Sequence, residues 1–195
     1  MASGLRRWCV RACVLLVLAA STVAADATDD RRALVMLRVL AYDKHLGDRV
    51  GDDITVMIAY PATDQGNLER ARWTAAFGNV SGLKVGSRSV SVISHRFEDA
   101  QKLDHELATS HAAALVVCDG LTRSISVQNI VAATRARKVL TLSTREAEVV
   151  KGLAVGIVPG SKKDEIVVNV TAATAEGVKF DAGLLQLART VEDQP

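Results

Sequence analysis

The sequence predicts a single α/β domain with a mostly parallel sheet, flanking helices, a C-terminal antiparallel hairpin and a docked C-terminal helix. Between residues 54 and 151, short β-rich runs alternate with helical stretches, which implies right-handed crossovers between parallel strands. Runs such as "ITVMIAY" and "AAALVVC" are continuously apolar rather than alternating, as expected of strands that are buried on both faces. No repeat, low-complexity tract or Pro-rich linker divides the chain, so one domain is the economical interpretation.

The first 25 residues have the layout of a secretory signal peptide. Three arginines precede an apolar run from Ala12 to Ala20, and small residues follow up to Ala25. The apolar run is shorter than the roughly 20 residues that span a bilayer. We therefore expect cleavage after Ala24 or Ala25, and an uncleaved amino-terminal anchor is the alternative. The domain boundaries are then 1–25 for the signal peptide and 26–195 for the exported α/β domain.

Removing the leader changes both the charge and the cysteine content. The chain has 24 Lys and Arg and 22 Asp and Glu, and the leader holds three Arg and no acid, so 21 basic residues remain against 22 acidic ones. This near-neutral balance gives no electrostatic reason to expect a nucleic-acid partner. Cys9 and Cys13 leave with the leader and Cys118 stays alone, which excludes an intrachain disulfide in the exported chain.

The first element after the leader is a helix over residues 31–46, "RRALVMLRVLAYDKHL". Apolar side chains surround most of this helix, so more than one of its sides must be covered. We expect burial between the sheet and another helix of the same chain. A subunit interface is the alternative.

Four strand–helix pairs follow this first helix. The helix with "LERARW" should be half core and half solvent, and Trp73 could alternatively anchor a partner. We expect strands at residues 54–60, 89–94, 112–118 and 138–143, and helices at residues 67–77, 98–109, 124–137 and 146–151.

The pattern changes after residue 152. "LAVGIVPGSKKDEIVVNV" places two β-rich runs around a turn, which predicts an antiparallel hairpin. Asp181 can cap a final helix, and Phe180 can pack on Leu185. The apolar stripe of that helix is expected to consist of Leu184, Leu187, Ala188 and Val191.

Ligands of doubly wound sheets bind beyond the carboxyl ends of the strands, at a topological switch point. In this chain the rim would hold Tyr60, His95, Asp119, Ser143 and Thr144. The candidate ligand-binding residues are Asp119, Ser143, Thr144 and Arg145. Cys118 should be a structural core cysteine, with a reactive thiol as the alternative, and Asp119-Gly120 should be the turn that opens the next helix.

The sequence carries no strong catalytic motif. His105 and His111 are six positions apart, which places them about 120° apart around a helix and argues against a shared metal. There is no G-x-S-x-G elbow, and "GIVPGSKK" lacks the spacing of a P-loop. We therefore expect no enzymatic activity, no cofactor and no metal, with an exported hydrolase or thiol enzyme as the alternative class.

Several blocks of the sequence resemble the YfiR family of exported bacterial proteins. "IVVNVTAATAEGVKF" entering "DAGLLQLARTV", preceded by "KVLTLS" and "VKGLAVGIV", carries the resemblance, together with the first apolar helix and strands like "ITVMIAY" and "AALVVC". The order and spacing of these blocks extend the similarity over nearly all of the exported chain.

The resemblance implies a periplasmic regulator that is not an enzyme. Such a protein would restrain an inner-membrane diguanylate cyclase through the periplasmic sensor region of that cyclase, and so lower cyclic di-GMP and biofilm formation. The resemblance also implies a homodimer. The disulfides of the family's best-known member are not transferable to a chain that retains only Cys118.

Two functional hypotheses stay open at this point. The first is a regulator whose partner is a diguanylate cyclase or a sensor histidine kinase. The second is a periplasmic small-ligand-binding protein that uses the strand-end cleft.

Overall fold

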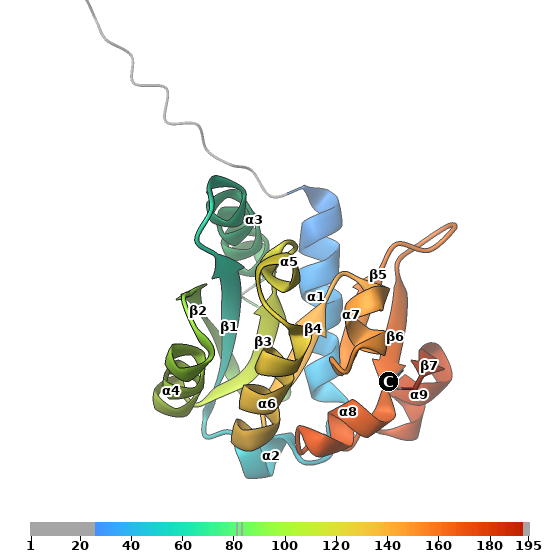
Figure 1. The fold of residues 1–195 in the computed structure, drawn as a ribbon. Coiled ribbons are helices and arrows are strands. Elements are labelled where there is room, and N and C mark those ends of the chain that lie inside the picture. Colours follow the sequence, from blue (N-terminus) through green and yellow to red (C-terminus); the bar gives the residue numbers. More distant parts are fainter. Residues whose placement is uncertain (1–25, 81, 83, 193–195) are drawn as a thin grey trace, which may run out of the picture.

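A seven-stranded sheet forms the centre of the computed structural model, which describes residues 26–80, 82 and 84–192 (Figure 1). The strand order is β2-β1-β3-β4-β5-β6-β7, with β2 and β7 at the two edges. The first five strands in this order are parallel, β6 is antiparallel to β5, and β7 is parallel to β6. The strands are β1 (Asp53–Pro61), β2 (Ser89–Phe97), β3 (Ala112–Val117), β4 (Leu140–Ser143), β5 (Val155–Val158), β6 (Glu165–Asn169) and β7 (Arg189–Val191).

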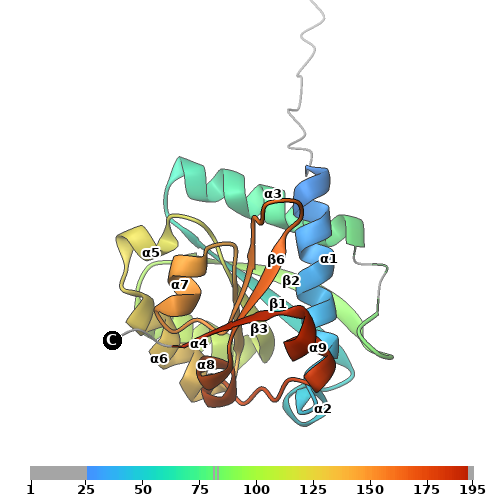
Figure 2. The same cartoon turned by 90° about the vertical axis from the view of Figure 1, so that its right-hand side faces the viewer.

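Helices cover both faces of this sheet, which confirms the predicted fold class. Figures 1 and 2 show α6 and α7 on one side of the sheet and α1 on the other. The helices are α1 (Ala27–Ala41), α2 (Leu46–Arg49), α3 (Asp64–Val80), α4 (Ala100–Ser110), α5 (Leu121–Ser124), α6 (Val127–Arg137), α7 (Glu146–Val150), α8 (Val170–Ala175) and α9 (Ala182–Leu187). The predicted signal peptide, with Cys9 and Cys13, lies outside the described residues.

The alternating faces of β1 show how the two core layers are separated. Ile54, Val56 and Ile58 pack in one cluster with side chains of α1 and α3. Met57 and Ala59 belong to the other cluster, which contains side chains of α4 and α6. Burial on both faces explains why the sequence of this strand is apolar without alternation.

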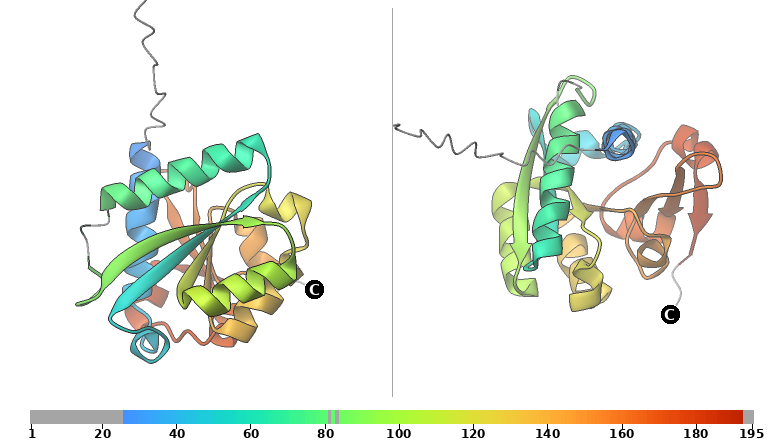
Figure 3. Two further views of the ribbon diagram at one scale, coloured as in Figure 1. Left: turned by 90° about the vertical axis from the view of Figure 1, so that its left-hand side faces the viewer. Right: turned by 90° about the horizontal axis from the view of Figure 1, so that it is seen from above.

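Helix α1 is buried within its own chain, as expected for a helix that is apolar on most sides. Met36 and Leu40 are fully buried in the same cluster as Trp73 and Phe77 of α3. Figure 3 shows α3 lying across the amino-terminal part of α1. Trp73 is 8% exposed and its ring packs against Phe77 with centroids 5.9 Å apart, so this tryptophan belongs to the core. Among the described helices, none has the length and hydropathy that a membrane span requires.

The predicted helix over residues 31–46 ends earlier than expected, at Ala41. The chain turns at Asp43, whose carboxylate accepts backbone hydrogen bonds from His45 and Lys179, both at 3.0 Å. Arg49 of α2 donates to the same carboxylate at 2.5 Å. The backbone N–H of Asp181 also donates to the Tyr42 carbonyl at 2.9 Å. These bonds fasten the end of α1 to the segment that precedes α9.

The C-terminal region confirms the hairpin but corrects the last helix. Strands β5 and β6 pair antiparallel around the predicted turn, and Asp181 caps α9 by accepting from the Gly183 N–H at 2.7 Å. The predicted stripe of Leu184, Leu187, Ala188 and Val191 is wrong, because α9 ends at Leu187, Ala188 is its extended C-cap, and Arg189–Val191 form β7. Leu184 is buried, whereas Leu187 is 68% exposed. The sequence also did not reveal α8.

Candidate functional site at the carboxyl edge of the sheet

The strand order places a topological switch point between β1 and β3. From β1 the chain crosses to β2 on one side, and from β2 it crosses back to β3 on the other side of β1. The two crossovers run over opposite faces, through α3 and α4. Ligands of such sheets bind beyond the carboxyl ends of the strands next to this point. The relevant strand ends here are Pro61 and the segment Cys118–Gly120.

Cys118 lies directly below this edge and is a core residue. It is fully buried, and its backbone N–H donates to the Ala59 carbonyl at 3.0 Å. Burial, with added effects of the Glu69 and Asp119 charges, raises the pKa of the Cys118 thiol far above its ordinary value. A thiol in this environment is a poor source of thiolate. Gly120 adopts a φ of 86° at the start of α5, which confirms Asp119-Gly120 as the turn that opens a helix.

The four predicted ligand-binding residues lie in two hydrogen-bonded groups. The Thr144 hydroxyl donates to Asp119 at 3.1 Å, which joins the ends of β3 and β4. Ser143 is fully buried, and its hydroxyl donates to Glu148 of α7. The guanidinium of Arg145 lies 3.7 Å from the same carboxylate.

Glu148 is the shared partner within the second group, although no local sequence signal singled it out. The carboxylate also accepts from the Thr122 hydroxyl at 2.5 Å, so it binds α5, α7 and the end of β4 together. Glu148 is 3% exposed. Burial raises the pKa of Glu148, and the hydrogen bonds from Ser143 and Thr122 only partly offset this effect.

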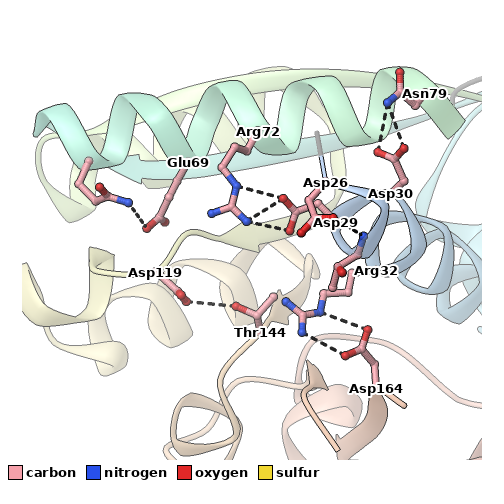
Figure 4. Close-up of polar contacts among 12 residues, drawn as sticks. Asp26, Asp29, Asp30, Arg32, Glu69, Arg72, Asn79, Asp119, Thr144 and Asp164 are labelled. Atoms are coloured by element: carbon pink, nitrogen blue, oxygen red, sulfur yellow. Dashed lines mark hydrogen bonds and ion pairs between the residues drawn. The ribbon is translucent and has the colours of Figure 1, made fainter. Parts of the chain in front are cut away.

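Glu69 is the second residue that sequence reasoning missed. It lies on α3 and is 8% exposed. Its Oε1 accepts from Gln65 at 3.4 Å, while its Oε2 is buried with no hydrogen-bond partner. Burial raises the pKa of Glu69, the bond from Gln65 lowers it, and the charge of Asp119 raises it again. Figure 4 shows Glu69 pointing from α3 towards the loop that carries Asp119.

Ion pairs fix the elements that border this edge. Arg72 of α3 donates to Asp29 of α1 at 2.7–3.0 Å through two nitrogens. Arg32 of α1 binds Asp164 of the β5–β6 turn through two hydrogen bonds of 3.0 and 3.2 Å (Figure 4). The start of α1 is therefore held by both α3 and the hairpin.

Tyr60 and His95, also expected at the rim, line a different groove. This groove of about 430 Å³ lies between β2 and α4 and includes Lys102, His105 and Glu106. Nε2 of His95 is buried there without a hydrogen-bond partner, and burial lowers the pKa of this imidazole. The residues expected at the rim therefore lie in two places. Tyr60 and His95 line this groove, and Asp119, Ser143, Thr144 and Arg145 lie at the ends of β3 and β4.

The arrangement at Asp119 can bind and orient a polar group. Asp119, Thr144 and Arg145 are partly exposed there and offer a carboxylate, a hydroxyl and a guanidinium, whereas Ser143 and Glu148 are buried. Within the described ranges, no group of three or more His, Cys, Asp or Glu side chains is placed to hold a metal ion.

The comparisons with known proteins give one family and a set of similar folds. A family model described as YfiR/HmsC-like matches residues 68–189, which extend from α3 to β7. A comparison with curated proteins gave no match.

Three solved structures share the fold at low sequence identity. A conserved domain protein from Vibrio cholerae has a TM-score of 0.61 and 9% identity over 83% of this chain. The ABC domain in complex with L-Trp from Streptococcus pneumoniae has a TM-score of 0.57 and 13% identity over 82%. The ligand-free, open structure of a substrate-binding protein with adhesive properties from Clostridium difficile has a TM-score of 0.54 and 12% identity over 80% of this chain. This chain spans only 59–60% of the length of these three proteins.

Proposed function

We propose, because this chain belongs to the YfiR/HmsC-like family, that it binds the periplasmic sensor region of an inner-membrane signalling protein and restrains it. The family is one of periplasmic regulators of cyclic di-GMP signalling, and it is regulatory rather than enzymatic. The match over residues 68–189 is the observation that carries the proposal. The proposal has three finer parts. The partner is a diguanylate cyclase or a sensor histidine kinase, the chain is exported with cleavage of residues 1–25, and the interaction controls biofilm formation.

Such a regulator acts by binding rather than by chemistry. If it prefers the inactive conformation of the sensor region, it shifts the sensor towards that state by its difference in affinity for the two states. Tenfold discrimination supplies about 1.4 kcal/mol. A rigid α/β domain fits this role, because the surface it presents does not have to be ordered on binding.

The proposal is tested with a full-length cyclase or kinase encoded next to this protein. The partner is placed in nanodiscs, and the exported chain is added to its periplasmic side. We expect cyclic di-GMP synthesis, or autophosphorylation for a kinase, to fall saturably. Heat-unfolded chain is the control. Unchanged activity of every neighbouring cyclase and kinase would contradict the proposal.

Export is tested separately in cells that lack the chromosomal copy. Expression of residues 1–195 should restore low cyclic di-GMP, whereas residues 26–195 without the leader should not, because they remain in the cytoplasm. The mass of the protein from the periplasmic fraction locates the cleavage site, expected after Ala24 or Ala25. Equal complementation by both forms would contradict the proposal that the protein acts in the periplasm.

A homodimer belongs to the same proposal. Cys118 is fully buried, so the dimer would not be linked by a disulfide. Light scattering of the protein from the periplasmic fraction should give twice the chain mass, with and without reductant. A monomer at micromolar concentration would contradict this part.

A second candidate function is small-ligand binding at the carboxyl edge of the sheet. It is supported by Asp119, which follows β3 at the switch point where α/β sheets bind ligands, and by Ser143, Thr144 and Arg145 at the end of the neighbouring strand β4. A thermal-shift screen against periplasmic metabolites tests it, because a ligand of the folded state raises the melting temperature saturably. The shift should be lost in Asp119→Asn. A flat screen counts against this function and leaves the regulator proposal standing.

A further inference from the structure

We propose that Glu69 and Asp119 form a binding site for the protonated primary amine of a small ligand. The site lies at the carboxyl edge of the sheet, between α3 and the β3–α5 turn. The inference rests on the small-ligand function proposed above and adds the chemical class of the ligand.

The first observation is that one oxygen of the Glu69 carboxylate lacks a hydrogen bond. The Glu69 side chain is 8% exposed, and its Oε2 is buried without a hydrogen-bond donor. Buried polar atoms in folded proteins are nearly always paired, because an unpaired one loses its hydration without compensation. The weak bond from Gln65, at 3.4 Å, reaches only Oε1. The N–H group of a ligand can therefore supply the hydrogen bond that Oε2 lacks.

The second observation is the position of Asp119 opposite this carboxylate. Figure 4 shows the two side chains approaching from different elements, Glu69 from α3 and Asp119 from the turn after β3. The Thr144 hydroxyl donates to Oδ1 of Asp119 at 3.1 Å and so orients it. Asp119 is half-buried, so part of its surface is open to solvent at this edge.

The third observation is that the nearby cations have other partners. Arg72 makes three hydrogen bonds to Asp29, and Arg145 lies 3.7 Å from Glu148. Arg123 is exposed and affects Glu69 only through space. When both carboxylates are ionised, the pair therefore attracts a cation and repels an anion.

The chemistry of the pair favours an ammonium group. A primary ammonium is a compact charge with three N–H donors, so one can reach Oε2 of Glu69 and another Asp119. A quaternary ammonium has no N–H to donate to Oε2. A metal ion would need more ligands than the described residues bring together.

The test uses the protein purified from the periplasmic fraction, with n-butylamine and 1,4-diaminobutane as probes. Thermal shift and calorimetry are compared with tetramethylammonium, n-butanol, butyrate, MgCl₂ and NaCl at matched ionic strength. We expect saturable stabilisation by the two amines alone. Glu69→Gln and Asp119→Asn should each weaken amine binding by about tenfold or more, because each removes a charged acceptor.

Glu146→Gln is the matched control, because Glu146 is paired with Arg189 at 2.8 Å on the exposed side of α7. It should bind amines as the unchanged protein does. If Glu69→Gln does not fold, Asp119→Asn carries the test alone. The proposal is overturned if both variants bind amines normally, if tetramethylammonium or NaCl stabilises equally, or if Mg²⁺ binds in place of the amine.

The outcomes also separate this inference from the function on which it rests. A neutral or anionic metabolite that stabilises the protein, with its effect lost in Asp119→Asn, would sink the amine site and leave the small-ligand function in place. Failure of every amine and every other metabolite would sink both.

Discussion

Glu176 is an ionisable side chain held entirely inside the core. It is fully buried, and it accepts from the Thr141 N–H at 2.8 Å, the Thr141 hydroxyl at 2.9 Å and the Thr134 hydroxyl at 3.1 Å. Burial nevertheless raises the pKa of Glu176 to about 8, because the three hydrogen bonds do not compensate the lost hydration of the charge.

This shift predicts how stability depends on pH. Between the ordinary value of 4.5 and a folded-state pKa of about 8, the folded chain binds a proton at Glu176 that the unfolded chain releases. Stability from this residue is therefore fully present below pH 4.5 and is lost as the pH rises to 8, by at most about 1.4 kcal/mol per pH unit. We expect Glu176→Gln, which keeps the shape and has no proton to lose, to remove this slope.

Urea unfolding at several pH values measures the effect as the difference between the two proteins. Taking the difference cancels the contributions of Glu69 and Glu148, whose pKa values are also raised. A difference that stays constant from pH 5 to pH 8 would contradict a protonated Glu176.

Sequence reasoning found four of the six residues described at the candidate site. Asp119, Ser143, Thr144 and Arg145 were predictable because each follows a strand, and parallel strands end at one edge of the sheet. Glu69 and Glu148 were not, because they lie on helices where a glutamate is ordinarily solvated. Their burial depends on how α3 and α7 pack, which has no local signature.

At the scale of elements, Gly66 fixes the start of α3 against the end of β1. A Cβ at Gly66 would lie 2.1 Å from the Pro61 carbonyl oxygen, whereas one at Gly78 in the same helix would meet nothing within 4 Å. We therefore expect Gly66→Ala to destabilise the protein by about 1–3 kcal/mol. Gly78→Ala should stabilise it by up to about 1 kcal/mol, since alanine is the better helix former.

Chemical denaturation of the two variants provides the comparison. They make the same substitution in the same helix, so helix propensity is controlled and only the contact with Pro61 differs. Equal effects of the two alanines would mean that α3 can shift freely relative to β1.

The predicted strands were accurate for the buried strands β1, β3 and β4 and also for the edge strand β2, whose side chains are mostly exposed or half-buried. The strands at residues 54–60, 89–94, 112–118 and 138–143 match β1 to β4 within a few residues. The chain after Leu187 was misassigned because helical spacing of apolar residues is a local signal. Its backbone instead pairs with β6, for example Thr190 with Val168, and this non-local pairing overrides local preference.

At the scale of the whole molecule, one core cluster extends along most of the strands of the sheet. The cluster that contains α1 and α3 also includes side chains of β1, β3, β4, β5 and β6. We therefore expect one cooperative unfolding transition for residues 26–192. A fragment of residues 68–189, the range of the family match, lacks β1, the partner of both β2 and β3, and should not fold.

Circular dichroism and calorimetry of the two fragments test this expectation. Residues 26–192 should show equal calorimetric and van't Hoff enthalpies. A cooperative transition in the shorter fragment would show that β1 and α1 are dispensable for the fold.

The bonds at Tyr42 and Asp43 have a consequence for biogenesis. The contact between Asp43 and the backbone of Lys179 spans 136 positions of sequence, so it cannot form until Lys179 has been synthesised, and contacts of such long separation form slowly. Until then the nascent chain lacks the contact that holds the end of α1 to the segment before α9. If the chain is exported as proposed, the translocase would meet a polypeptide that is not yet closed at this contact and can still be threaded, and the contact would form after export.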